Sequence, residues 1–303
     1  MKQEIIHIKT LKEYYRMIGL KGLKHPLMGV FSYEGFPEIQ LTSAVKVTFA
    51  FYIISIKIDY DCKVQYGQTS YDFDEGVMGF IAPGQVHIID SSFRIPKKGW
   101  SLAIHPDLFA GLPLAKKIRE YGFFDYSVNE ALILSEEEEQ SMNELFRTIQ
   151  EEYDRPLDSF SQDVLVSQID LLLTFCNRYY NRQFLMRSKP NNELLARFET
   201  LLHQYFNSDL VEEEGYPTVR YFAAQLNVSP NYLSDVLRNV SGQNAQQHIH
   251  SKMIEKAKEL LSATNLSVNE ISCQLGFEYS QSFSKLFKAK ANISPLAFRQ
   301  SFK

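Results

Sequence analysis

Cysteines and long hydrophobic runs are scarce in this chain of 303 residues. Its three cysteines, Cys62, Cys176 and Cys273, are far apart and odd in number, so the sequence indicates neither a disulfide framework nor a CxxC metal site. The longest apolar stretch, Val47 to Ile56, has ten residues, about half of what a membrane-spanning helix needs. The first ten residues contain no continuous hydrophobic segment. We therefore expect neither a membrane helix nor a signal peptide, and a cytoplasmic location.

The composition is that of an ordinary globular protein, with 45% apolar and 22% charged residues. The 22 phenylalanines and 17 tyrosines are enough to form a sizeable core, which excludes a disordered chain, a collagen and a coiled-coil filament. The length is about twice that of a usual single domain. Two or three domains are therefore expected.

Charge is distributed unevenly along the chain. Residues 1–215 hold 22 Lys and Arg against 31 Asp and Glu, whereas residues 216–303 hold 10 against 5. Basic side chains neutralise phosphates and release the counterions condensed on them. The basic C-terminal segment therefore points to a polyanionic partner.

Residues 45–104 have the composition of short β-strands, with runs of β-branched and aromatic residues separated by Gly, Pro and Asp. Strands at this spacing suggest a small antiparallel barrel or sandwich. After Pro106, apolar residues recur at helical spacing. The expected helices are 114–121, 135–152, 159–180 and 192–206, the second of them starting with a capping box at Ser135 and Glu138.

Residues 216–303 contain a two-helix unit that occurs twice. In the first copy Thr218 caps a short helix, a turn follows at residues 227–230, and Gly242 ends the second helix. In the second copy Ser267 is the cap and Asn292 stands where Gly242 stood, and both Gly and Asn tolerate a positive φ.

A small residue stands where the two helices of each copy should cross, Ala223 in the first and Ser272 in the second. Two helices joined by a turn of three or four residues form a helix-turn-helix, whose second helix presents its polar face to the DNA major groove. An amphipathic helix of about 27 Å, from Ala245 to Ser262, separates the copies. This length suits two recognition helices about one duplex turn apart, roughly 34 Å.

The polar residues on the second helix of each copy are the candidate DNA contacts, because they can donate or accept hydrogen bonds at base edges and phosphates. They are Ser229, Asn231, Ser234 and Arg238 in the first copy, and Ser280, Gln281, Ser282, Lys285 and Lys288 in the second.

Residues 218–303 resemble the DNA-binding domain of the AraC/XylS family of bacterial transcription regulators. The second copy matches the family signature at Ile271, Gly276, Phe277, Phe283, Ser284, Phe287, Lys288, Ser294, Pro295, Phe298 and Arg299. The first copy and the intervening helix match at Ala223, Leu226, Ser229, Leu233, Gly242, Ala257, Leu260 and Leu261. Three positions depart from the pattern: Asn292 replaces a usual Gly, Met253 a common Arg, and Asp235 a base-contacting basic or amide residue.

The family resemblance implies that the N-terminal part is a cupin-like barrel that binds an effector or dimerises. Residues 76–87 are similar to the second cupin motif, with His87 where a metal ligand would fall, but the first motif has no counterpart. One histidine does not hold a catalytic metal, so we expect a pocket or core role for His87 and no metal site. The candidate effector-pocket residues are Tyr52, Tyr66, Phe80 and His87.

The sequence thus predicts an α+β protein with a β-rich, cupin-like sensing domain (1–134), a helical connector or dimerisation region (135–207), a linker (208–217) and a twin helix-turn-helix domain (218–303). The predicted function is sequence-specific binding of double-stranded DNA in transcription regulation, with a small-molecule effector, a homodimer, no cofactor and no catalytic residues. Two alternatives stay open: a cupin-type small-molecule enzyme with a basic appendage, and a protein-interaction adaptor.

Overall fold

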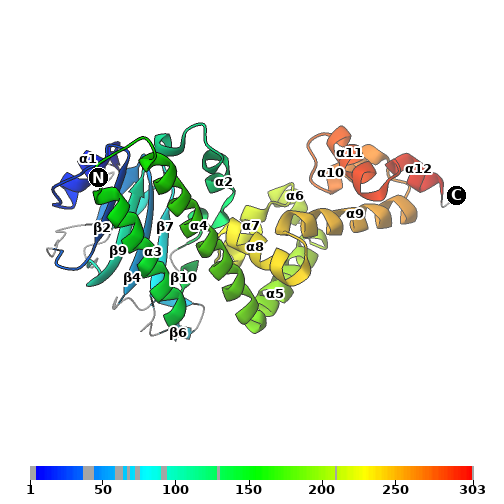
Figure 1. Ribbon diagram of the computed structural model, residues 1–303. Coiled ribbons are helices and arrows are strands. Elements are labelled where there is room, and N and C mark those ends of the chain that lie inside the picture. Colours follow the sequence, from blue (N-terminus) through cyan, green and yellow to red (C-terminus); the bar gives the residue numbers. More distant parts are fainter. Residues whose placement is uncertain are drawn as a thin grey trace. The chain divides into compact units, whose positions relative to one another are not determined.

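The computed structural model describes residues 5–36, 44–58, 64–66, 69–71, 76–89, 94–127, 130–208 and 210–301 (Figure 1). The chain divides into two compact units, Met1–Gln183 and Phe184–Lys303. The predicted domain boundaries at residues 134, 207 and 217 are a different division and stay a prediction. Among the described residues, no helix is both long and apolar enough to span a membrane.

The first unit is built on a five-stranded antiparallel sheet. Its strand order is β10 (Leu132–Ile133), β7 (Val77–Ile81), β4 (Tyr52–Ile58), β9 (Lys98–Ile104) and β2 (Met28–Ser32). A second sheet has the order β1 (Ile5–Ile8), β3 (Val45–Phe49) and β8 (His87–Ile89), and a two-stranded sheet pairs β5 (Val64–Tyr66) with β6 (Thr69–Tyr71). All pairs are antiparallel except β1 with β3.

One aromatic core joins the two larger sheets. It includes Phe49 from β3 and Ala103 from β9, and it is closed by Tyr14 from α1 (Leu11–Met17). The Tyr14 ring centroid lies 5.7 Å from that of Phe49 and 5.4 Å from that of Phe51. The two sheets therefore face each other across this core, as in a sandwich.

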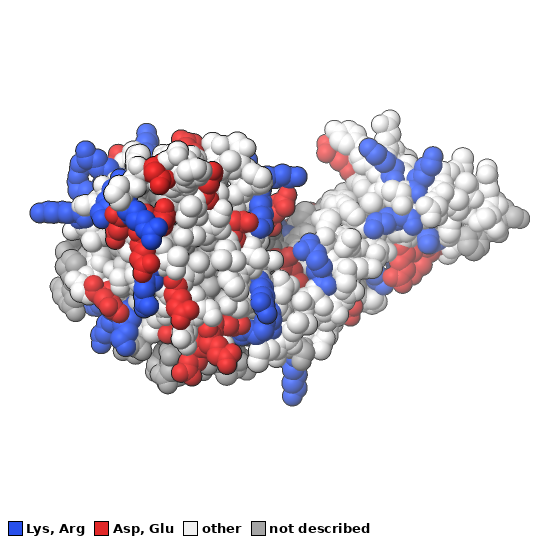
Figure 2. Space-filling model, viewed as in Figure 1, with Lys and Arg blue, Asp and Glu red and all other residues white. Residues whose placement is uncertain are grey.

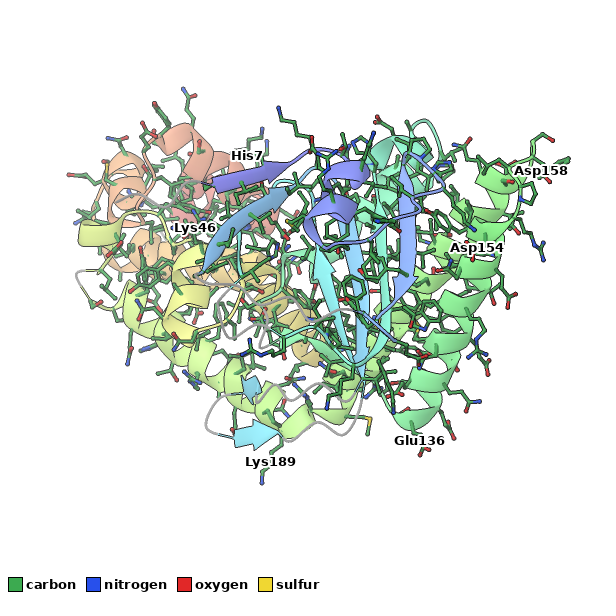
Figure 3. All side chains as sticks on the ribbon, turned by 90° about the vertical axis from the view of Figure 1, so that its left-hand side faces the viewer. His7, Lys46, Glu136, Asp154, Asp158 and Lys189 are labelled. Atoms are coloured by element: carbon green, nitrogen blue, oxygen red, sulfur yellow. The ribbon has the colours of Figure 1, made fainter. Side chains whose placement is uncertain are left out.

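Helices cover the other face of the five-stranded sheet. Successive side chains of a strand point to opposite faces, so Trp100 points away from the core that contains Ala103. Trp100 stacks on Phe146 of α3 (Glu136–Asp154), with ring centroids 6.3 Å apart. Figure 3 shows α3 running alongside the sheet from Glu136 to Asp154. The other helices that begin in this unit are η1 (Pro106–Phe109), α2 (Leu114–Glu120), η2 (Gly122–Asp125) and α4 (Ser161–Met186).

The predicted α+β class is confirmed, but the described strands form three separate sheets and do not close into a barrel. Strand composition predicted the strands without stating which strands pair. The parallel pairing of β1 with β3 places a strand from the N-terminal end of the chain in the second sheet, and no local pattern encodes such a pairing.

The second unit is helical throughout its described residues. Its helices are α5 (Ser188–Phe206), α6 (Leu210–Glu214), α7 (Val219–Leu226), α8 (Pro230–Ser241), α9 (Ala245–Ala263), α10 (Val268–Gln274), α11 (Ser280–Ala291) and α12 (Pro295–Gln300). Buried side chains from α5 to α11 form one core, among them Phe198, Phe222, Leu233, Ile249, Ile271 and Phe283. Both copies of the two-helix unit thus share a single core.

The segment 208–217, which the sequence predicted as a linker, contains α6. Val211 of α6 is buried in the core of the second unit. A helix of five residues is too short to give a recognisable apolar period, which is why the sequence pattern did not indicate it.

The predicted caps and left-handed ends of the two helix-turn-helix copies are confirmed. Thr218 accepts a hydrogen bond from the Tyr221 N–H at the start of α7, and Ser267 forms a capping box with Glu270 at the start of α10. The Ser267 backbone N–H, which donates to the Glu270 carboxylate, also holds the pKa of Glu270 below its ordinary value. Gly242 after α8 and Asn292 after α11 both have a left-handed backbone, with φ of 76° and 61°.

Candidate nucleic-acid interface

The two helix-turn-helix copies have matching geometry. Helices α8 and α11 both have 12 residues, and each residue of α11 lies 50 positions after its counterpart in α8. Ala223 of α7 and Ser272 of α10, at the expected crossings, are each only 1% exposed. A larger side chain at either position would hold the two helices of that copy apart.

Helix α9 packs against helices of both copies. Its 19 residues correspond to about 28 Å at the helical rise, which agrees with the predicted spacer. The helix starts with a capping box between Asn244 and Gln247. The second unit therefore contains two candidate recognition helices on one continuous support.

Helix α11 presents its candidate contacts to the surface. Gln281, Ser282, Lys285 and Lys288 are exposed, and Ser280 is half-buried. Figure 2 shows Lys and Arg side chains gathered over the α9 to α12 part of the second unit. Burial and, to a smaller extent, the charge of Lys290 lower the pKa of His250 on α9. The lowered pKa favours the neutral form of His250, and Lys and Arg supply the positive charge of this surface.

Helix α8 differs from α11 in its candidate contacts. Ser229 is 7% exposed and caps α8, because its hydroxyl accepts a hydrogen bond from the Tyr232 N–H. Asn231 and Ser234 are half-buried. The Arg238 guanidinium is exposed and donates to the Asp235 carboxylate over 2.8 Å. Asp235, which stands where the family commonly has a base-contacting residue, thus holds a basic group at this surface.

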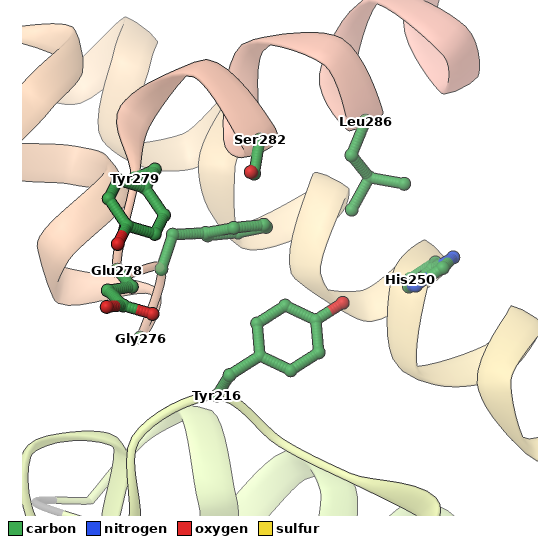
Figure 4. Close-up of a pocket in the computed structure, with 8 residues that line it drawn as sticks. Tyr216, His250, Gly276, Glu278, Tyr279, Ser282 and Leu286 are labelled. Atoms are coloured by element: carbon green, nitrogen blue, oxygen red, sulfur yellow. The ribbon is translucent and has the colours of Figure 1, made fainter.

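Sequence reasoning missed Tyr279, which is 63% exposed at the start of α11. It occupies the position of Ser229 in the first copy but makes no capping hydrogen bond with its side chain. Tyr279 also lines a cleft of about 560 Å³ together with Tyr216, His250, Phe277, Ser282 and Leu286 (Figure 4). Aligning the copies at their 50-residue offset would have identified this aromatic residue at a cap position.

The candidate effector-pocket residues do not line one common pocket. Tyr52 and Phe80 lie in the aromatic cluster on the helix-covered side of the sheet, with Tyr52 5.0 Å from Phe124 and Phe80 4.6 Å from Phe123 between ring centroids. Burial raises the pKa of Tyr52.

His87 lies on β8 of the other sheet, paired with Val47, and burial lowers its pKa. The side chain of Tyr66 lies outside the described residues. No group of three or more His, Cys, Asp or Glu side chains in the described part of the chain is arranged to hold a metal ion.

Comparison with known proteins identifies the second unit. Residues 222–301 match the model of a helix-turn-helix domain. The chain is 32% identical over 108 residues to the HTH-type transcriptional activator AarP of Providencia stuartii, covering 80% of that protein and 33% of this chain. The chain belongs to the AraC/XylS family.

Other relatives align with this chain over only part of their length. The Msm operon regulatory protein of Streptococcus mutans is 27% identical over 146 residues, which are 48% of this chain and 50% of that protein. The chain spans about half of this relative's length and only 18% of another curated relative. The C-terminal domain of the response regulator yesN from Fusobacterium nucleatum is 31% identical, over 33% of this chain and 96% of that structure, with a TM-score of 0.29.

The capping role of Ser229 gives a stability prediction. Ser229→Ala should lower the free energy of unfolding by about 1 kcal/mol, because the Tyr232 N–H loses its acceptor. Gln281→Ala on exposed α11 is the control and should change it by less than about 0.5 kcal/mol. Urea denaturation followed by circular dichroism measures both values. Equal losses in the two variants would contradict a specific capping role for Ser229.

Proposed function

We propose that the chain is a sequence-specific DNA-binding transcription regulator that acts in the cytoplasm. The observation that carries this proposal is the exposed polar face of α11 in a family whose named relatives are regulators. Those relatives favour a regulator over the alternative of a cupin-type enzyme.

The two kinds of exposed side chain on this surface would have different tasks. Lys285 and Lys288 of α11 and Arg238 of α8 supply positive charge, which fixes a protein on phosphates without reading sequence. Gln281 and Ser282 supply hydrogen-bonding groups at the start of α11, where a recognition helix reaches base edges. Contacts by both helix-turn-helix copies would give a higher affinity than either copy has alone, because α9 joins them and makes the second contact intramolecular.

A DNA-binding experiment tests this function. Duplexes selected from a random pool with the full chain define a binding site, and footprinting should show protection of about two duplex turns. On the selected duplex, Gln281→Ala or Lys285→Ala should weaken binding by about 1–3 kcal/mol if these residues read bases. Lys116→Ala, in an exposed ion pair on α2 of the first unit, is the matched control and should bind normally.

Random duplex distinguishes the outcomes of this experiment. If Lys285→Ala weakens binding to random duplex as much as binding to the selected duplex, Lys285 contacts a phosphate. The absence of DNA binding by the wild-type chain at low ionic strength would overturn the proposal and favour the protein-interaction adaptor.

The domain division proposed for this function is a cupin-like sensing domain (1–134), a helical connector (135–207), a linker (208–217) that contains α6, and the DNA-binding domain (218–303). Two facing sheets around one aromatic core support the cupin-like part. An effector bound there would regulate DNA binding if it favours one of two conformations of the protein.

A polar cleft of about 460 Å³ supports effector binding in the first unit. Glu139, Asn143 and Arg147 line it from one face of α3, at spacings of four residues, and Trp100 lines it from β9. Charged groups of both signs beside an indole ring suit a polar metabolite that carries hydroxyl or carboxylate groups.

Tryptophan fluorescence tests this cleft, because Trp100 is the single tryptophan of the chain. Titration with a panel of sugars, sugar phosphates and sugar acids should identify compounds that change its emission, and Arg147→Ala should weaken their binding by about tenfold. Lys116→Ala serves as the control. A compound that alters DNA binding but leaves Trp100 emission unchanged would place the effector site elsewhere.

An apolar stripe on α4 supports a homodimer. Leu171 is 47% exposed, Val164 38%, and Phe160, just before the helix, 67%. Exposed Asp163 and Arg178 lie toward opposite ends of the stripe. An antiparallel pair of α4 helices, related by a two-fold axis near Leu171, would bury these apolar side chains and place each Asp163 opposite Arg178 of the second copy.

Sedimentation analysis tests the dimer. The wild-type chain should be dimeric and Leu171→Glu monomeric, because the substitution places a charge at the centre of the apolar stripe. Asp163→Arg should weaken the dimer, and the double variant Asp163→Arg/Arg178→Asp should restore it. A dimer that tolerates all three variants uses another surface.

A further inference from the structure

The segment between α6 and α7 is held firmly on one side. The Tyr205 hydroxyl of α5 donates to the Gly215 carbonyl over 3.0 Å, and the Gly215 N–H donates to the Val211 carbonyl of α6 over 3.0 Å. The Tyr205 ring also contacts Phe222 of α7, with centroids 5.5 Å apart. Gly215 is therefore fixed to the part of the second unit that contains the first helix-turn-helix.

The same segment contacts the turn of the second helix-turn-helix. Gly276 has a φ of +80°, and a Cβ atom added to it would lie 2.6 Å from the Gly215 carbonyl carbon and oxygen. The Tyr216 ring meets Phe277 edge-on, with centroids 5.0 Å apart and planes at 77°. Phe277 in turn contacts Phe283 of α11, with centroids 5.5 Å apart.

Tyr216 also contacts the helix that supports both copies. Together with His250 of α9 it lines the cleft described above, and burial raises the pKa of Tyr216, an effect that Gln246 of α9 partly offsets. Figure 4 shows the Tyr216 ring extending from the α6–α7 segment toward α9 and α11. The Tyr216 side chain therefore connects the α6–α7 segment with the α10–α11 turn and lies beside α9.

The contact between Tyr216 and Phe277 is a second connection between the two helix-turn-helix copies, in addition to α9. Two helix pairs joined through one rod can rock as the rod bends or as side chains shift against it. A contact off the axis of the rod removes this freedom, because rocking would separate the Tyr216 ring from Phe277. The backbone of Gly276 lies so close to that of Gly215 that a Cβ atom would not fit between them, so the two segments cannot move closer together.

We propose that Tyr216 is a positioning residue that sets the orientation of α11 relative to α8. Through it, the two recognition faces keep the separation needed to enter neighbouring major grooves of one duplex. This inference rests on the proposed DNA-binding function, because the orientation of α11 relative to α8 affects binding only to a DNA site that both copies contact.

Binding to whole and half sites tests the role of Tyr216. The probes are the duplex selected by the wild-type chain and two derivatives with one or the other half scrambled. Tyr216→Ala should bind the whole site about tenfold more weakly and each half site about as well as the wild type, because only joint engagement is lost. Tyr216→Phe, which keeps the ring against Phe277, should stay within about twofold of the wild type. Equal losses on whole and half sites would contradict a positioning role.

A distance measurement without DNA separates this inference from the proposed function. Spin labels at Arg220→Cys and Lys290→Cys, in a Cys62→Ser/Cys273→Ser background, report the separation of α7 and α11 by dipolar spectroscopy. The distribution should be narrow in the otherwise unchanged chain and in Tyr216→Phe, and broad in Tyr216→Ala. Tyr216→Leu, which keeps apolar bulk, replaces Tyr216→Ala if that variant does not fold. A narrow distribution in a folded variant without the ring would overturn the inference, whether or not the chain binds DNA.

Discussion

Close packing at two helix crossings is the constraint on which the DNA-binding unit depends. Ala223 and Ser272 allow the two helices of each copy to approach, and the buried Ser272 hydroxyl donates to the Asn269 carbonyl. This approach buries Leu233 and Phe283 on the inner faces of α8 and α11 and leaves their polar faces outside. The DNA-facing surface is thus a consequence of the core, because a short helix buries only one apolar stripe.

The first unit follows a different principle, in which both faces of a sheet are covered. Aromatic side chains pack between the two larger sheets, while α3 and its neighbours cover the opposite face. Polar side chains reach the surface at one end of the five-stranded sheet, where Gly99 has a φ of +113° and accepts hydrogen bonds from Tyr33 N–H and the Ser32 hydroxyl. A firm backbone there supports the polar cleft lined by Trp100 and Arg147.

Much of the second unit was predictable because its signals are local. Caps at Thr218 and Ser267, left-handed ends at Gly242 and Asn292, and the inward apolar positions depend on residues within a few positions of one another. The exposed α11 residues Gln281 and Lys285 followed from the same period. The capping role of Ser229 and the exposure of Tyr279 were not predicted. The two residues occupy equivalent positions before α8 and α11, but only Ser229 has a side chain that caps its helix.

The sequence by itself determined the helices of the DNA-binding unit, their order and the family, because helical period, capping chemistry and signature residues are properties of short segments. Only the tertiary structure decided how β1 joins β3, which face Tyr52 and Phe80 occupy, and that Tyr216 meets Phe277. Each of these depends on residues distant in the chain that come together when apolar surface is buried. A periodic pattern states which side of an element is buried, but not which element buries it.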